Sequence, residues 1–417
     1  MNTESHNRIP SGKTAAAEFD AKDAMSDYRI QFILDDSEIY LDGNSLGPLL
    51  HGVKDRINHT VDHEWGRRLI RSWNESWIDL PRSVAAKVAP IIGAAAENVR
   101  FADSVSINLF KLMAASLIAA PEKTVILSVK DMFPTDLYIA EGLAQLLGPG
   151  RCELQLIEFD EISATLSETT NLLLLSQVNF RTGEAYDVAE MTNLAHQAGA
   201  RVLWDLSHSA GVLPVNLELN QVDYAVGCGY KFLNGGPGAP AFVYVDPGLQ
   251  KDLQQPLSGW MGHAAPFEFQ PAYQPAPGMD QFLVGTPGIL GMSAMDAALD
   301  LWQDISLDQV FGKSQALTAY FIQLVEQSEA LGSLSVIKPA SRGSQVSLTH
   351  EDAFAISQAL IDAGIICDFR TPNIIRFGFA PLYTRFQDVV TTITRLEEIL
   401  INAHYQNPKY QVAGKVT

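Results

Sequence analysis

Residues 224–245 of the chain, YAVGCGYKFLNGGPGAPAFVYV, place a lysine and a glycine-rich turn between two short apolar runs. The runs YAVG (224–227) and AFVYV (241–245) have the length and composition of buried β-strands. Lys231 follows the first run closely, so the pattern predicts an amine at the end of a strand. The sequence on both sides extends this alternation.

Further apolar runs precede this stretch and are separated by helical patterns. The runs read TVILSV (124–129), CELQLIEF (152–159), NLLLLSQV (171–178) and RVLWDL (201–206). Amphipathic helices are expected between them at 135–147 and 188–199, the second ended by Gly199. Alternating strands and helices predict an α/β fold with a mostly parallel sheet between helices.

The chain after this sheet predicts a smaller α/β domain. A proline-rich passage at 267–288 suits neither a regular helix nor a central strand, so we expect a long ordered loop. Helices are expected at 291–303, 313–332, 352–363 and up to about residue 404, and strands at 344–350 and 374–379. The predicted domains are an arm (1–38), a large domain (39–290) and a small C-terminal domain (291–417).

The N-terminal residues up to about 25 are small and polar and show no periodicity, which predicts a loose arm with order beginning near Ile39. This segment has no apolar signal-peptide core, and no apolar run approaches the roughly 18 residues of a spanning helix. We therefore expect a soluble protein that is neither exported nor bound to a membrane.

Composition narrows the function classes. The chain has 417 residues, 47% of them hydrophobic, which exceeds the size at which one core stops growing and favours two domains. A net charge of −19 disfavours nucleic acids and anionic membranes as partners. Cys152, Cys228 and Cys367 share no short spacing, so neither a disulfide framework nor a zinc site is expected, and a reducing cytoplasm fits best.

The surroundings of Lys231 exclude two nucleotide motifs. A Walker A loop needs Lys followed by Ser or Thr, and a dinucleotide fingerprint needs a third glycine where Phe232 stands. A partly desolvated lysine at a strand end is instead a candidate nucleophile for Schiff-base formation. The alternative is an ordinary surface lysine.

Asp205, in RVLWDLSHSAG, also ends a predicted strand. Ligands of open α/β sheets bind outside the carboxyl ends of strands, and pyridoxal phosphate enzymes pair a Schiff-base lysine with an acid on the pyridine nitrogen. Asp205 and Lys231 together therefore favour this cofactor. The alternative for Asp205 is an N-cap of a helix starting at Leu206 or Ser207.

A phosphate group needs donors, and Ser104, Ser106 and Asn108 open a predicted helix that could supply them at its N-terminus. The alternative is an ordinary polar helix cap. His208 could donate to a phosphate and Phe133 could stack on a pyridine ring, or both could be structural core residues.

Motifs from residue 41 to beyond 380 resemble the kynureninase family. They are LDGNSLG (41–47), EWG (64–66), LIRSWN (69–74), FPTDLYIAEGL (133–143), WDLSHSAG (204–211), YKFLNGGPG (230–238), PLSGWMGH (256–263), RGSQVS (342–347) and IIRFGFAPLYTRF (374–386). The resemblance implies a fold-type-I pyridoxal phosphate enzyme, a homodimer with active sites shared between subunits. It implies hydrolysis of the carbon–carbon bond of L-kynurenine, and possibly of 3-hydroxykynurenine, to anthranilate and L-alanine in tryptophan degradation.

The resemblance also implies roles for single residues. Lys231 matches the Schiff-base lysine, Asp205 the partner of the pyridine nitrogen, and Tyr230 a phosphate contact and proton donor. Arg376 matches the arginine that holds the substrate α-carboxylate, although an arginine in IIRFGF could also form a structural ion pair. The other implied cofactor contacts are Val105, Ser106, Phe133, Asp136, His208 and, from the neighbouring subunit, Trp260 and Thr286.

Some residues depart from the family pattern or leave the substrate open. Val105 stands where a threonine is expected, which removes a hydroxyl donor for the phosphate. Arg67 and Arg68 replace small or polar residues after EWG, near a segment that shapes the substrate pocket. Gly285 and Thr286 resemble bacterial enzymes that prefer kynurenine to its 3-hydroxy derivative.

Three rival interpretations remain open. His59 and His63 have the spacing of two metal ligands on a helix, but the residues between them lack the glutamate of a zinc motif. A cysteine desulfurase-like lyase would use the same fold, although no cysteine is expected in an exposed Gly- or Ser-rich loop. A catalytically silent paralogue is the third, and it is disfavoured by the retained residues Lys231, Asp205, Tyr230 and Arg376.

Overall fold

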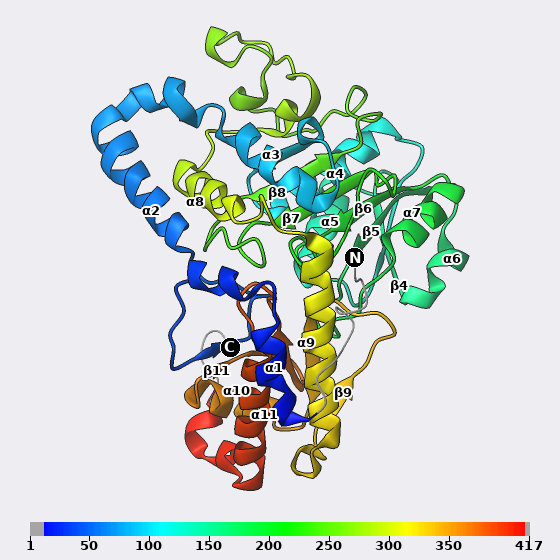
Figure 1. The fold of residues 1–417 in the computed structure, drawn as a ribbon. Helices are drawn as coiled ribbons and strands as arrows, with labels where there is room; N and C mark the ends of the chain where they lie inside the picture. The colour runs from blue at the N-terminus through cyan, green and yellow to red at the C-terminus, as the bar shows by residue number, and fades with distance from the viewer. Residues whose placement is uncertain (1–11, 413–417) are drawn as a thin grey trace, which may run out of the picture.

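The computed structural model describes residues 12–412, and its larger part is built on one sheet (Figure 1). This seven-stranded sheet has the order β2-β8-β7-β6-β5-β3-β4. Its strands are β2 (Val99–Ala102), β3 (Val125–Val129), β4 (Glu153–Ile157), β5 (Thr170–Ser176), β6 (Arg201–Asp205), β7 (Tyr224–Cys228) and β8 (Ala241–Val245). β3 to β7 run parallel, whereas β8 is antiparallel to both of its neighbours. The predicted, mostly parallel sheet is confirmed, and β2 is an addition that the sequence analysis did not predict.

The central strands are buried along their whole length because helices cover the sheet. β5, β7 and β8 contain no exposed residue, as expected for apolar strands without alternation. The helices of this part are α3 (Leu80–Ile92), α4 (Val105–Ala119), α5 (Pro134–Leu147), α6 (Ile162–Thr165), α7 (Val188–Gln197) and α8 (Ile289–Asp300). α4 contacts α5 and strands β5, β7 and β8, and α7 contacts β6.

The smaller part, at the bottom of Figure 1, has its own antiparallel sheet and its own core. The sheet order is β12 (Asp368–Arg370), β13 (Ile374–Gly378), β10 (Gln345–Thr349) and β9 (Ser335–Ile337). Its helices are α9 (Leu307–Gln327), α10 (Ala353–Asp362) and α11 (Phe386–Ile401). A short parallel pair joins β1 (Ile39–Tyr40) to β11 (Ile365–Ile366). The boundaries of the domains at 39–290 and 291–417 stay predictions.

The expectation of a loose arm with order beginning near Ile39 is wrong for residues 12–38. α1 (Ala16–Ala21) packs on α11, and Asp20 accepts hydrogen bonds from the backbone N–H groups of Phe386 and Gln387. Asp20 thus satisfies unpaired donors at the N-terminus of α11. These partners are far apart in sequence, so no local pattern reveals the contact. Residues 1–11 of the predicted arm lie outside the described residues.

The remaining segments are short turns and one longer helical segment. α2 (His51–His59) packs against α8 and continues into the π-helix η3 (Thr60–Arg68) at the left of Figure 1. The proline-rich passage contains only short 3-10 turns, and Asp280 within it pairs with Arg82 and Arg100. The further π-turn is η5 (Trp73–Trp77), and the 3-10 turns are η1 (Lys13–Ala15), η2 (Ser26–Gln31), η4 (Leu69–Arg71), η6 (Ala96–Asn98), η7 (Phe159–Glu161), η8 (Trp260–Gly262), η9 (Pro266–Glu268), η10 (Gly278–Phe282), η11 (Glu329–Leu331), η12 (His404–Gln406) and η13 (Pro408–Tyr410). Within residues 12–412, no helix combines the length and apolarity needed to span a bilayer.

Candidate active site

The ends of β6 and β7 bring Lys231 close to His208. Nζ of Lys231 lies 3.3 Å from Nε2 of His208, and both residues are buried. β6 ends at Asp205 and the neighbouring parallel strand β7 ends at Cys228, so both sequence motifs lie at the carboxyl edge of the sheet. This is the edge at which open α/β sheets bind ligands.

Asp205 is held by the turn that follows it. The backbone N–H and the hydroxyl of Ser207 donate to Oδ1 of Asp205 at 2.9 and 2.6 Å. Residues 206–213 contain turns and no helix, so the helix N-cap that was the alternative for Asp205 is wrong. The side chain is 2% exposed and fixed in direction, as a partner of a buried ligand must be.

Asp136, in the first turn of α5, is a second buried acid near Asp205. Burial, and then the negative charge of Asp205, raise the pKa of Asp136 well above its ordinary value, although Lys231 opposes the shift. Its Oδ2 atom has no hydrogen-bond partner among the described residues. The raised pKa of Asp136 favours the neutral form of its carboxyl group.

His208 is neutral. Burial lowers the pKa of its imidazole well below the ordinary value, and the positive charges of Lys231, Arg376 and Arg370 lower it further. Its Nδ1 atom has no partner within the described part of the chain. A neutral imidazole with one ring nitrogen unsatisfied can form a hydrogen bond to a polar or anionic group.

Two aromatic rings flank the lysine. Nζ of Lys231 lies 5.8 Å from the ring centroid of Phe133 and 5.9 Å from that of Tyr230. Phe133 is half-buried and packs edge-on against Phe180. Burial, followed by the neighbouring Cys228 and Asp205, raises the pKa of Tyr230 above its ordinary value, so its hydroxyl keeps its proton at neutral pH.

The N-terminus of α4 carries Val105 and Ser106, both half-buried. The first N–H groups of a helix lack acceptors within it, and these two backbone donors suit an anion whatever the side chain at position 105. Ser104 is the N-cap, accepting from the N–H of Ile107 at 3.4 Å, and Asn108 donates to the carbonyl of Ala102. The ordinary capping alternative thus holds for Ser104, and the amide of Asn108 is structural.

Trp260 and Thr286 make no described contact with Lys231. Trp260 is 41% exposed and contacts the rings of Phe267 and Phe269. Thr286 is exposed and lines a pocket of about 230 Å³ that includes Asp103. No hydrogen bond or ring contact joins either residue to Lys231 within residues 12–412. Their predicted contacts lie across a subunit interface and stay predictions.

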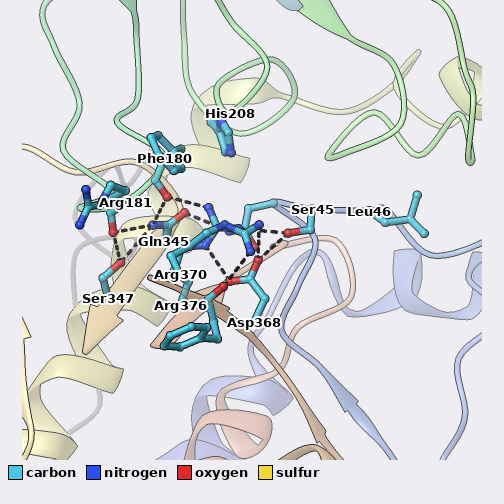
Figure 2. Close-up of polar contacts among 12 residues, drawn as sticks. Ser45, Leu46, Phe180, Arg181, His208, Gln345, Ser347, Asp368, Arg370 and Arg376 are labelled. Atoms are coloured by element: carbon cyan, nitrogen blue, oxygen red, sulfur yellow. Dashed lines mark hydrogen bonds and ion pairs between the residues drawn. The ribbon is translucent and has the colours of Figure 1, made fainter. Parts of the chain in front are cut away.

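Arg376 is buried in an ion pair with Asp368 (Figure 2). Its Nε donates to Oδ1 of Asp368 at 2.7 Å, and its Nη2 bonds Oδ2 of the same carboxylate. Nη2 also donates to Oγ of Ser45 and Nη1 to the carbonyl of Phe180. The alternative of a structural ion pair therefore describes this arginine, and its predicted contact with a substrate carboxylate remains a prediction.

Sequence reasoning missed Asp368 and Gln177. Asp368 faces Arg376 directly in the antiparallel register of β12 and β13, and two oppositely charged residues flanking a short hairpin were the available signal. Gln177 follows β5, its backbone N–H donates to the carbonyl of Asp205 at 3.1 Å, and its side-chain Oε1 has no described partner. No local pattern distinguishes this glutamine from others.

The unsatisfied atoms fit the cofactor that the resemblance implies. Asp136 Oδ2, Gln177 Oε1 and His208 Nδ1 are buried without partners among the described residues, a costly arrangement unless a polar molecule completes it. A lysine amine, a buried carboxylate, aromatic rings and a helix N-terminus are the groups that pyridoxal phosphate requires.

The rival sites receive no support. The rings of His59 and His63 stack at 5.1 Å, while the nearby Glu64 already bonds Arg56 and Trp77. Within residues 12–412, no group of three or more His, Cys, Asp or Glu side chains could hold a metal ion. All three cysteines are free and buried, and burial raises the pKa of the Cys152 thiol to about 11, which disfavours sulfur transfer through a thiolate.

Sequence comparison places the chain beside curated kynureninases. Residues 310–396 match the family model described as the kynureninase C-terminal domain. The chain is 44% identical over 411 residues to the kynureninase of Burkholderia mallei strain SAVP1, covering 96% of this chain and 99% of the relative. It is 46% identical over 390 residues to that of Deinococcus radiodurans, covering 91% and 94%.

Solved structures share the fold at low identity. The apo cysteine desulfurase of Thermococcus onnurineus matches with a TM-score of 0.77 and 19% identity over 90% of this chain and 98% of that one. The cysteine desulfurase CsdA of Escherichia coli matches with a TM-score of 0.75 and 18% identity over 90% and 99%. A mutant of the cystine C–S lyase C-DES with glycine covalently linked to its pyridoxal phosphate cofactor gives 0.77 and 19% over 89% and 99%. These likenesses confirm the predicted fold-type-I architecture.

Proposed function

Because the chain belongs to the kynureninase family, we propose that it hydrolyses L-kynurenine to anthranilate and L-alanine. It is a pyridoxal phosphate-dependent hydrolase. The observation that carries the proposal is the buried Lys231 amine beside His208 at the strand edge that also bears Asp205, in a chain with full-length kynureninase relatives. The cysteine desulfurases share the fold alone.

The residues that would hold the cofactor are those with unsatisfied groups or free donors. Lys231 supplies the amine, Asp205 the carboxylate for the ring nitrogen, and Phe133 a ring face. The N–H groups of Val105 and Ser106 suit the phosphate, and the open Nδ1 of His208 suits an acceptor of the same molecule. Pyridoxal phosphate supplies, when bound, an electron sink that stabilises negative charge on the carbon next to the substrate amine.

Lys231 is the base for the substrate Cα proton in this proposal. Its amine is buried beside the imidazole of His208, whose lowered pKa makes it a poor proton acceptor. Nζ of Lys231 is therefore the group at this edge that we propose takes the Cα proton.

Tyr230 is the second proton carrier. Its hydroxyl stays protonated because burial and nearby acidic groups raise its pKa, and its ring lies beside the lysine amine. Water adds to the γ-carbonyl of the substrate, the Cβ–Cγ bond breaks and anthranilate leaves; a neutral phenol can then donate the proton that Cβ needs and regain one from solvent. Arg376 is proposed to hold the α-carboxylate, and kynurenine to be preferred over its 3-hydroxy derivative.

We further propose a homodimer with shared active sites in the cytoplasm. Exposed aromatic side chains gather around Trp260, where Phe267 and Phe269 are 59% and 77% exposed. Apolar rings of this kind favour burial in a subunit interface. Trp260 and Thr286 would then reach the phosphate of the neighbouring subunit. The free, buried cysteines suit a reducing compartment.

Anthranilate fluorescence tests the function directly. The purified protein, supplied with pyridoxal phosphate, should release anthranilate from L-kynurenine faster than it releases the hydroxylated product from 3-hydroxykynurenine. L-Cysteine serves as the comparison substrate, with sulfide as its product. Sulfide release without anthranilate release would replace the hydrolase by a desulfurase, and no product from any of the three would support a silent paralogue.

A further inference from the structure

We propose that Asp368 is a positioning residue that orients Arg376 so that the site prefers a carboxylate to a neutral group on the substrate. This inference rests on the proposed function, in which Arg376 meets the substrate α-carboxylate. Asp368 itself would touch no substrate. Its effect is carried by the guanidinium group that it holds.

Asp368 binds Arg376 through two buried hydrogen bonds. The two residues are directly opposite on β12 and β13, and the carboxylate bonds both Nε and Nη2 of the arginine. Arg376 is 1% and Asp368 3% exposed. Two hydrogen bonds along one edge of a planar guanidinium fix the orientation of its plane. Because both residues are buried, solvent does not compete for these bonds.

The Asp368 carboxylate also contacts Ser45 and Arg370. Its Oδ2 accepts from the hydroxyl of Ser45 at 2.8 Å and pairs with Nη2 of Arg370 at 2.8 Å. Burial opposes ionisation of Asp368, but the hydrogen bond and charge of Arg376, with that of Arg370, outweigh it and lower the pKa. The Asp368 carboxylate therefore contacts two arginines and Ser45 of the 41–47 loop. Asp42 of the same loop is a second acid in this cluster: burial, and then the negative charge of Asp368, raise its pKa to about 7.

The fixed plane directs the other side of the guanidinium toward the active site. Nη1 donates to the carbonyl of Phe180 at 2.6 Å, and Phe180 packs against Phe133 beside Lys231. The charge of Arg376 also reaches His208, whose pKa it lowers. In Figure 2, His208 is drawn on the far side of the guanidinium groups from Asp368. The Asp368 carboxylate therefore binds Arg376 on the side of the guanidinium that faces away from His208.

Ser45 accepts a hydrogen bond from Arg376 that a substrate carboxylate could accept in its place. Its hydroxyl accepts from Nη2 of Arg376 at 3.2 Å while donating to Asp368. A substrate carboxylate could take over that Nη2 donor together with the second N–H of Nη1. Asp368 would keep its own bonds to the arginine throughout, so the plane of the guanidinium would not change on binding.

The Asp368→Asn substitution distinguishes a positioning role from a simple charge effect, because the two predict different changes in anion binding. Asp368→Asn removes one negative charge beside the arginines, and the nearby Asp42, whose pKa Asp368 raises to about 7, can replace at most that charge. Charge alone therefore predicts anion binding that is at least as tight. If Asp368 orients Arg376, the same substitution weakens anion binding, because an amide cannot accept two arginine bonds with equal strength and the guanidinium turns toward other acceptors.

The probes are two unreactive analogues of kynurenine that lack the α-amino group, one with the carboxylate and one with a carboxamide. Inhibition constants of both on the holoenzyme, and calorimetric dissociation constants, give the preference for the carboxylate. Asp368→Asn should reduce this preference about tenfold or more, the scale of a charge-assisted hydrogen bond, with the carboxamide little affected. KM for kynurenine should rise more than kcat falls.

Matched variants separate positioning from structural damage. Asp388→Asn is the control, because Asp388 is 3% exposed and bonds Arg385 through Nε and Nη2 on α11; it should leave the preference unchanged. Arg376→Ala gives the reference value for complete loss. If Asp368→Asn fails to fold, Asp368→Glu decides by the same ratio, since it keeps the charge but displaces the arginine.

Two results with Asp368→Asn overturn the inference, and one with Arg376→Ala does so as well. One is tighter carboxylate binding in Asp368→Asn, and the other is an equal change for the carboxylate and the carboxamide. Failure of the proposed function looks different: the wild-type protein would release no anthranilate. Failure of the Arg376 assignment alone would leave the preference intact in Arg376→Ala, which also removes the basis for a role of Asp368.

Discussion

The side-chain amine of Lys231 lies 3.3 Å from Nε2 of His208, and Nδ1 on the other side of the same imidazole has no partner among the described residues. The ring is neutral because burial and three nearby cations lower its pKa. The imidazole of His208 therefore contacts the lysine amine through Nε2. Its Nδ1 atom remains available to form a hydrogen bond to a bound ligand.

We expect His208→Phe to retain the fold and to bind pyridoxal phosphate more weakly, by about tenfold, because one buried hydrogen bond to the cofactor is lost. Equilibrium dialysis with the absorbance of the bound cofactor measures the dissociation constant. The melting temperature of the apoprotein serves as the control for folding. Unchanged cofactor affinity would show that Nδ1 of His208 faces another group.

The two buried acids should respond unequally to amide substitution. Asp136 is protonated because burial and Asp205 raise its pKa, so Asp136→Asn replaces a neutral group by a neutral group. We expect its kcat/KM to change by about threefold or less, whereas Asp205→Asn should lose about 100-fold or more. Steady-state anthranilate release with saturating cofactor measures both. Equal losses would contradict unequal roles for the two acids.

Shared sites predict complementation between inactive subunits. Lys231→Ala lacks the amine and Trp260→Ala lacks the contact from the neighbouring subunit, so each homodimer should be inactive or nearly so. A hybrid dimer contains one site in which both residues are intact. Mixing the two variants under conditions that exchange subunits should restore anthranilate release, and sedimentation should give a dimer. A fully active monomer would contradict the shared site.

The His196–Asp223 pair predicts a stability that depends on pH. Nε2 of His196 lies 2.7 Å from Oδ2 of Asp223, and this hydrogen bond raises the pKa of the folded imidazole. The contribution is therefore complete below the unfolded pKa of about 6.5 and disappears as the pH rises through the raised folded value. His196→Gln should lower the melting temperature more near pH 5.5 than near pH 8.5. An equal loss at both would exclude a titrating pair.

Much of the large sheet could be predicted because its strands are buried on both faces. Runs such as LLLL in β5 and AFVYV in β8 need no partner to be recognised, and the lysine after β7 and the aspartate ending β6 meet because parallel strands end at one edge. In the small sheet only β10 and β13 were predicted, because these strands are mostly buried, whereas the short and partly exposed β9 and β12 were not. These patterns predict where each strand ends, and therefore which residues lie at the same edge of the sheet.

Contacts between distant segments could not be predicted. The arm before Ile39 has no period of its own and is ordered by Asp20 at the N-terminus of α11. The ion pair of Asp368 with Arg376 depends on the register of β12 and β13, and register is set by packing and turn geometry. The unsatisfied Gln177 side chain has no sequence signature at all.

The identity of the cofactor lysine is the central claim, and borohydride reduction followed by peptide mass spectrometry tests it most directly. The holoprotein should be yellow, lose its visible band on reduction, and carry the reduced cofactor on the peptide that contains Lys231. Lys231→Ala should show neither the band nor the labelled peptide. A label on another lysine, or an unchanged label in Lys231→Ala, would contradict the account.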